Sequence, residues 1–173
     1  MTSPVVAFYT GDAPDHLGRW IEEIWSWDDH RIEATHDYIQ WLFPLPTASR
    51  FSATAPMLTA EDVVAFATDE RLRERLRTSL SVMLCFYGLG LGGRHEAPII
   101  APAPSFNERA KHWVTRGNHN HLRLTRILRS LDLLGLHQEA EALQAGLIDI
   151  AARIEGGVSS ETLRFWRQAL PPG

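Results

Sequence analysis

Apolar residues recur at helical spacing along most of the 173-residue chain, and this periodicity limits the possible folds more than any other feature. Apolar side chains three and four residues apart lie on one face of a helix. The stripe in residues 118–135 consists of Leu124, Ile127, Leu128, Leu131 and Leu134. Only Val5–Tyr9 and Ala97–Ala101 resemble short strands, and neither alternates apolar with polar residues. We therefore expect an all-α fold, a single compact domain spanning residues 1–173 with about seven to nine helices and two long loops.

Glycine and proline place the two loops. The segment Pro46–Pro56 has no periodicity, and Gly88–Pro104 holds four glycines and three prolines. We expect Gly88 to end the preceding helix and the segment that follows it to be a flexible loop. Residues Gly90–Arg94 lack both the Gly-Lys-Ser/Thr ending and the strand-then-helix setting of a phosphate-binding loop, so that function is excluded.

The composition is that of an ordinary globular protein, with 45% hydrophobic and 22% charged residues. The sequence contains no apolar run long enough for a membrane span, and its first residues lack a secretory signal. The single cysteine, Cys85, fits a reducing compartment, and we expect a cytoplasmic protein. Because Cys85 lies in an apolar helical run, we expect it to be buried in the core, together with Trp20 and Ile24.

Charge is distributed unevenly along the chain. Residues 1–70 hold 12 acids and 3 bases, whereas residues 71–173 hold 9 acids and 14 bases. The interpretation that we favour is that the acidic part packs on the basic part. The alternative is an anion site in the basic part. The net charge of −4 and the lack of aromatic residues between the basic ones argue against nucleic acid.

Residues 35–44 are the most informative stretch. Thr35 can cap a helix and Pro44 can end it, and Tyr38, Trp41 and Leu42 fall on one face between them. His36 and Gln40 lie at the flank of that face. They either line a pocket or are polar groups satisfied inside the protein.

A second block, residues 118–131, begins another helix at Asn118. His119, Arg123 and Arg126 share one face at its start, where a carboxylate or phosphate would be favoured, although the arginines could equally pair with acids of the chain. His119 and His121 are two residues apart, so on a helix they diverge by roughly 200° and cannot share a metal ion. We therefore expect no metal site.

Two long blocks carry a family resemblance. Residues 36–45 read His-Asp-Tyr-Ile-Gln-Trp-Leu-Phe-Pro-Leu, and residues 119–131 read His-Asn-His-Leu-Arg-Leu-Thr-Arg-Ile-Leu-Arg-Ser-Leu. With weaker matches at 55–59 and 83–88, they resemble the conserved N-terminal domain of the opioid growth factor receptor family, in the same order, between Phe8 and Gly135. The resemblance implies a receptor for a short opioid peptide, an enkephalin, and brings no reaction, metal or cofactor with it. The alanine-, leucine- and arginine-rich composition suggests a stand-alone bacterial member.

Three functions are consistent with these features. The first is a non-enzymatic module that binds a peptide or a small anionic ligand, without a cofactor. The second is a small-molecule enzyme with a His/Gln/Arg pocket between the two signature helices, and the third is a scaffold in which the signature residues serve only folding. No activated nucleophile or acidic pair supports the enzyme. The candidate ligand-binding residues are His36, Gln40, Trp41, His119, His121, Arg123 and Arg126. The sequence predicts no particular oligomeric state.

The site hypothesis depends on one packing arrangement. The helix beginning at Thr35 is expected to lie against the helix beginning at Asn118, with Trp41 against Leu124, Ile127 or Leu128. Their polar residues would then converge at the mouth of one pocket. Trp27 or the loops around Ser49 and Arg94 could cover this mouth.

Overall fold

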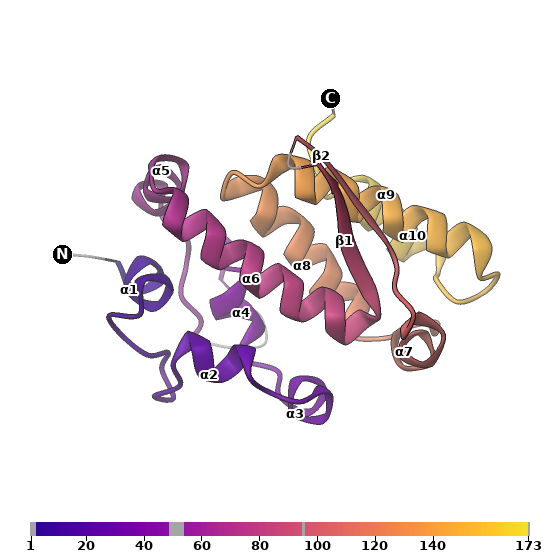
Figure 1. Cartoon of the computed structure of the whole chain (residues 1–173), viewed down its shortest axis with the longest axis horizontal. Helices are drawn as coiled ribbons and strands as arrows, with labels where there is room; N and C mark the ends of the chain where they lie inside the picture. The colour runs from indigo at the N-terminus through magenta and orange to yellow at the C-terminus, as the bar shows by residue number, and fades with distance from the viewer. Residues whose placement is uncertain (1–2, 49–53, 95, 173) are drawn as a thin grey trace. The chain divides into compact units, whose positions relative to one another are not determined.

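The computed structural model describes residues 3–48, 54–94 and 96–172, and these residues form ten helices and one two-stranded sheet (Figure 1). The elements are α1 Pro4–Thr10, α2 Ile21–Trp25, α3 Asp29–Ala34, α4 Ile39–Leu42, α5 Ala60–Thr68, α6 Glu70–Tyr87, β1 Leu89–Arg94, β2 Ala97–Pro102, α7 Phe106–Trp113, α8 Asn120–Leu133, α9 His137–Arg153 and α10 Ser160–Arg167. The chain divides into two compact units, Met1–Val82 and Met83–Gly173, and the division falls inside α6. The expectation of a single domain stays a prediction, and each unit is described by itself.

In the first unit, side-chain caps join α1 to α5. The Ser3 hydroxyl accepts a hydrogen bond from the Val6 amide at 3.1 Å and donates to the Asp62 carboxylate. Asp62 also closes a capping box with Thr59 at the start of α5. One carboxylate therefore fixes the first turns of two helices. The sequence predicts both caps, because proline follows Ser3 and acidic residues follow Thr59 within one turn, and both are confirmed.

Tyr9 is the centre of the core of the first unit. Its ring meets Phe66 edge-on at 5.1 Å, and its hydroxyl donates to the Leu42 carbonyl and lies 3.3 Å from the Ser79 hydroxyl. The Trp25 indole N–H donates to the same Ser79 hydroxyl at 2.9 Å. Burial raises the pKa of the Tyr9 phenol, so the phenol stays neutral and can act as this donor. Groups from α1, α2, α4 and α6 thus meet at one polar contact, and Phe66 of α5 packs against the Tyr9 ring beside it.

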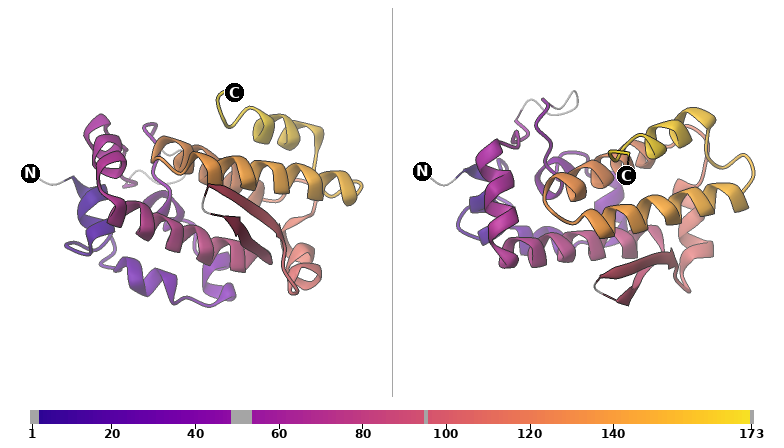
Figure 2. Two further views of the ribbon diagram at one scale, coloured as in Figure 1. Left: turned by 45° about the horizontal axis from the view of Figure 1, so that its top comes forward. Right: turned by 90° about the horizontal axis from the view of Figure 1, so that it is seen from above.

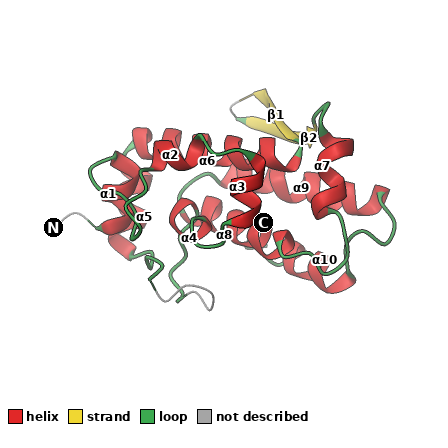
Figure 3. Ribbon diagram, turned by 90° about the horizontal axis from the view of Figure 1, so that it is seen from below, coloured by secondary structure: helices red, strands yellow, loops and turns green. Residues whose placement is uncertain are grey.

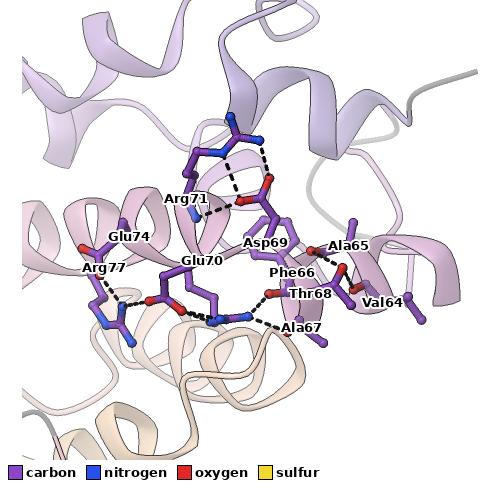
Figure 4. Close-up of polar contacts among 11 residues, drawn as sticks. Val64, Ala65, Phe66, Ala67, Thr68, Asp69, Glu70, Arg71, Glu74 and Arg77 are labelled. Carbon is purple, nitrogen blue, oxygen red and sulfur yellow. Dashed lines mark hydrogen bonds and ion pairs between the residues drawn. The ribbon is translucent and has the colours of Figure 1, made fainter.

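An arginine of α6 ends helix α5. The Arg73 guanidinium donates to the carbonyl oxygens of Phe66 and Ala67, which belong to the last turn of α5, and it also pairs with Glu70. Glu70 also pairs with Arg77, whose guanidinium lies 2.8 Å from the Glu70 carboxylate (Figure 4). The hydrogen bonds from Arg77 and Arg73 lower the pKa of Glu70 to about 2. The charged face of α6 is therefore an organised ion-pair network as well as a solvated surface.

The second unit is built on α8 and α9, with α10 packed against both. All five residues of the apolar stripe predicted in α8 are buried. Strand β2 lies along α9 (Figure 2). The approach is close enough that a Cβ on Gly146 of α9 would lie 2.6 Å from the carbonyl oxygen of Ile100 in β2. Glycine at position 146 therefore allows the hairpin to pack on this helix.

The β-hairpin corrects the expected fold class, because Gly88–Pro104 was predicted to be a flexible loop. Strands β1 and β2 pair antiparallel from Leu89 opposite Pro102 to Arg94 opposite Ala97 (Figure 3). Three glycines in β1 and two prolines in β2 give both strands a poor intrinsic strand tendency. The hairpin forms in spite of this because Ile100 is buried against α9. The fold is mostly helical, with ten helices in the described residues rather than seven to nine.

Three local expectations are also wrong. Trp20 is 44% exposed, because the helix expected to begin at an Asp15 cap begins only at Ile21, and the buried residues of this helix are Ile21 and Ile24. Cys85 is exposed rather than buried, on the outer side of α6. Thr35 ends α3 instead of starting the signature helix, whose four residues begin at Ile39. The predicted helix ends at Phe43 and Gly88, and the burial of Ile24, are confirmed.

Gly88 should be essential for the second unit. Its φ of +72° favours glycine, and a Cβ there would lie 2.8 Å from the Cα of Phe106 and the Cβ of Arg109. We expect Gly88→Ala to destabilise the protein by about 2–4 kcal/mol. Gly92→Ala is the matched control, because its Cβ would meet nothing within 4 Å. Chemical unfolding of the two variants tests this, and equal midpoints would contradict the close packing at Gly88.

Arg73 should matter more than its neighbour Arg71, although both pair with an acid. The Arg73 side chain is 19% exposed and caps α5, whereas Arg71 is 89% exposed and bonds only Asp69. We expect Arg73→Met to lower the unfolding free energy by about 1–2 kcal/mol, and Arg71→Met by less than about 0.5 kcal/mol. Equal losses in urea titrations would show that the carbonyl contacts contribute nothing.

Candidate functional site

Three of the predicted site residues lie in the first unit. His36 is exposed between α3 and α4, whereas Gln40 and Trp41 are buried. When its side-chain amide is oriented so that the nitrogen faces the neighbouring carbonyls, Gln40 donates to the carbonyl oxygens of His36 at 3.2 Å and Asp37 at 3.1 Å. The Trp41 indole N–H donates to Nδ1 of His16 at 3.0 Å. Gln40 therefore holds the turn that leads into α4, and Trp41 binds a residue from another segment.

His121 in the second unit links three helices. Its Nε2 lies 2.8 Å from the carbonyl oxygen of Trp113 at the end of α7, so Nε2 carries the proton. Its Nδ1 lies 3.5 Å from the Thr162 hydroxyl of α10, and its own carbonyl accepts the Trp166 indole N–H at 3.3 Å. Burial lowers the pKa of His121, which favours the neutral ring in this position.

The other predicted residues of α8 differ in exposure. His119 is exposed at the start of the helix, and Arg126 is half-buried, which lowers the pKa of its guanidinium. Arg123 is buried and donates to the Asn120 side-chain oxygen at 3.2 Å, which also lies 3.4 Å from the Tyr87 hydroxyl. The first turn of α8 is therefore a polar cluster fastened to the end of α6.

The seven predicted residues are thus divided between the two units. Their convergence at one mouth, and the packing of Trp41 against α8, stay predictions. Ser49, which was expected to help cover the mouth, lies outside the described residues.

A network that the sequence analysis missed lies in the first unit, in the segment 11–20, called here the docking loop. Its centre is Asp15, whose carboxylate is 5% exposed. One carboxylate oxygen accepts the amides of Leu17 at 2.9 Å and Arg19 at 3.0 Å, and the other lies 2.6 Å from the Arg19 guanidinium. Arg19 also reaches the Asp37 carboxylate at 2.9 Å. A buried carboxylate with this many donors fixes both the backbone and the side chains of the loop.

The signature stretch holds the docking loop in place from a second side. The His16 ring stacks on the Trp41 ring, with the ring centres 6.0 Å apart and the ring planes 8° apart. The Nδ1 atom of His16 accepts the indole N–H of Trp41. Its Nε2, which must then carry the proton, lies 3.6 Å from the Asp37 carboxylate. Asp37 and Trp41 of the signature therefore position His16 and Arg19 of the loop.

The fixed loop exposes two large apolar side chains. Leu17 is 60% exposed at its tip, and Trp20 is 44% exposed at its end. The turn is closed by the Asp15 amide, which donates to the Arg19 carbonyl at 2.9 Å, and by the Gly18 amide, which donates to Asp15 at 3.0 Å. An ordered loop that presents a leucine and a tryptophan to solvent is the strongest candidate binding surface in the described part of the first unit.

One sequence pattern could have predicted the turn at the centre of this network. The sequence allows Asp15 to cap a helix through Trp20 and Ile24, which was our interpretation, yet Asp followed by Gly three residues later is typical of a β-turn. The acceptor role of Asp15 was recognisable, but its buried pairing with Arg19 and Asp37 depends on tertiary structure.

Two kinds of feature are absent from residues 3–48, 54–94 and 96–172. No group of three or more His, Cys, Asp or Glu side chains there is placed to bind a metal ion. Within the same residues, no helix has both the length and the apolar character needed to cross a membrane.

His121 should make the stability of the protein depend on pH. The folded state lowers its pKa below 6.5, so unfolding takes up a proton when the pH falls below that value. Its contribution to stability is therefore complete above pH 6.5 and is lost as the pH falls toward the folded pKa. We expect His121→Gln to reduce, relative to the parent, the loss of stability between about pH 7 and 5. Identical slopes in urea unfolding at several pH values would contradict a buried neutral His121.

Comparisons with known proteins agree with the two signature blocks. The opioid growth factor receptor conserved region matches residues 6–168. The opioid growth factor receptor of Mus musculus is 41% identical over 127 residues, covering 71% of this chain and 20% of the relative. The opioid growth factor receptor of Homo sapiens is 34% identical over 97% of this chain and 25% of the relative. The opioid growth factor receptor-like protein 1 of Xenopus tropicalis is 36% identical over 66% of this chain and 22% of the relative.

The chain spans about a fifth to a quarter of the length of these curated relatives. No solved structure matches it significantly. The profile match covers nearly the whole sequence, and the chain belongs to the opioid growth factor receptor conserved-region family.

Proposed function

We propose that this chain is a non-enzymatic interaction module that binds a peptide or small ligand through its docking loop. The observation that carries the proposal is the exposure of Leu17 and Trp20 on a loop fixed by the buried carboxylate of Asp15. The relatives are named as receptors, which supports a binding role.

Preorganisation makes such a loop an effective binding surface. A loop that is already ordered loses little conformational entropy when a partner binds, so more of the contact energy appears as affinity. Tryptophan is enriched among the residues that dominate binding energies, because it combines a large apolar area with few rotatable bonds. The docking loop is already ordered, and it exposes both Trp20 and Leu17.

The alternative enzyme would use the His/Gln/Arg residues of the two signature blocks. Acid–base catalysis needs a titratable group that is free to exchange a proton with a substrate. Protein atoms engage both the Gln40 amide and the two ring nitrogens of His121, which favours a structural role for these groups.

We also propose a cytoplasmic location and no nucleic-acid partner. The exposed thiol of Cys85 fits a reducing compartment, and the excess of acids in the first unit would repel a phosphate backbone.

The test is a selection from a random 12-residue displayed peptide library on the immobilised chain. We expect enriched peptides to bind Trp20→Ala at least about tenfold more weakly, the loss typical of a central tryptophan. The melting temperature should change little, because Trp20 is half-exposed. Val64→Ala, at an apolar residue of α5 that is 61% exposed, is the control and should bind like the parent. An absence of enriched peptides, or equal binding by Trp20→Ala, would overturn the proposal.

A further inference from the structure

We propose that the docking loop recognises a cationic side chain, best an arginine, which stacks on the exposed face of Trp20 beside carboxylates at the base of the loop. This inference rests on the proposed function and specifies the chemistry of the partner. It draws on three observations: the arginines that contact Trp25 and Trp27, the ion pairs of the carboxylates near the loop, and the positions of those carboxylates.

Two tryptophans close to Trp20 in the sequence, Trp25 and Trp27, already hold arginines. The Arg75 guanidinium lies 4.9 Å from the centre of the Trp25 ring, and the Arg31 guanidinium lies 4.3 Å from that of Trp27. A cation over an indole ring is attracted by the negative face of the π system. Trp20 has no ring or cation contact with any residue that the structure describes, and it is 44% exposed. It is therefore an indole with a face available to a cation from outside the chain.

The acids around the loop exceed the local cations. Residues 10–37 contain eight acids and two arginines. Arg19 is held by Asp15 and Asp37, and Arg31 pairs with Glu23 at 2.9 Å. The exposed Asp12 carboxylate accepts the Thr10 hydroxyl at 2.6 Å, and no cation of the described residues pairs with it. The segment therefore has carboxylate charge left for a partner.

The Asp12 carboxylate, which pairs with no cation of the described residues, and the Glu22 carboxylate, which pairs with Arg75, lie at the base of the docking loop. Asp12 follows Gly11, and the Glu22 carboxylate lies 3.8 Å from the position that a Cβ on Gly11 would occupy. Glu22 pairs with Arg75, yet its side chain remains 53% exposed. Two carboxylates thus lie where the loop begins, and Trp20 lies where it ends. A guanidinium can stack on an indole while its edge donates to a carboxylate, because its donors lie in the plane of the group.

An arginine suits this arrangement better than a lysine. The guanidinium is planar and weakly hydrated, so it stacks on an aromatic ring at a lower desolvation cost than an ammonium group. Leu17 at the loop tip would meet an apolar side chain next to the arginine. The expected partner is therefore a peptide segment in which an arginine neighbours a large apolar residue.

The experiment uses the peptides selected on the complete chain. Arginine beside an apolar residue should be enriched among them, and replacing that arginine by citrulline, its neutral isostere, should weaken binding about five- to thirtyfold, as loss of a partly desolvated cation–π pair would. Trp20→Leu, which keeps an apolar side chain, should lose most of this arginine preference. Asp12→Asn should weaken the arginine peptide more than the citrulline peptide.

The outcomes separate the two proposals. Enriched peptides that are neutral or acidic, or that bind equally well with citrulline, would overturn this inference and leave a docking loop with a different partner. A citrulline effect of the same size on Trp20→Leu would also overturn it, because the cation would then be bound elsewhere. If no peptide is enriched, the proposed function itself fails, and this inference fails with it.

Discussion

The docking loop depends on the buried ion pair between Asp15 and Arg19. Removing a carboxylate from water is costly unless charged and polar donors replace the lost hydration. Asp15 receives such donors from two backbone amides and one guanidinium, and the same guanidinium neutralises Asp37. The loop cannot change its backbone without breaking these contacts. A short segment with no secondary structure of its own can therefore have a defined conformation.

The second unit uses a histidine for a similar purpose. His121 meets the Trp113 carbonyl through one ring nitrogen and the Thr162 hydroxyl through the other, and its own carbonyl accepts the Trp166 indole. Buried polar groups are tolerated when each finds a partner, and such a network selects one arrangement of the helices around it. In both units the polar residues of the signature blocks specify how the segments pack.

The sequence predicted the features that depend on nearby residues. The caps at Ser3 and Thr59 and the apolar stripe of α8 were correct, because caps and periodicity act within a few residues. The hairpin was missed because its stability comes from Ile100 packing on α9, which is remote in sequence. Trp20 was misplaced because the residues after Asp15 form a loop and the helix begins only at Ile21, so Trp20 precedes the helix and is exposed. Trp41 was among the predicted site residues, which stay a prediction, and its contact with His16 could not be inferred from spacing.

In the proposed function, family membership and ligand identity rest on different residues. The blocks that carry the resemblance, residues 36–45 and 119–131, include Asp37, Gln40, Trp41 and His121, and each of these has a partner within the protein. Neither block contains Leu17 or Trp20, the exposed side chains of the docking loop. In this chain, Asp37 and Trp41 of the signature support the docking loop, whereas the side chains that we propose to bind a partner lie outside the signature blocks. The names of the relatives accordingly support a binding role more strongly than they support a particular peptide.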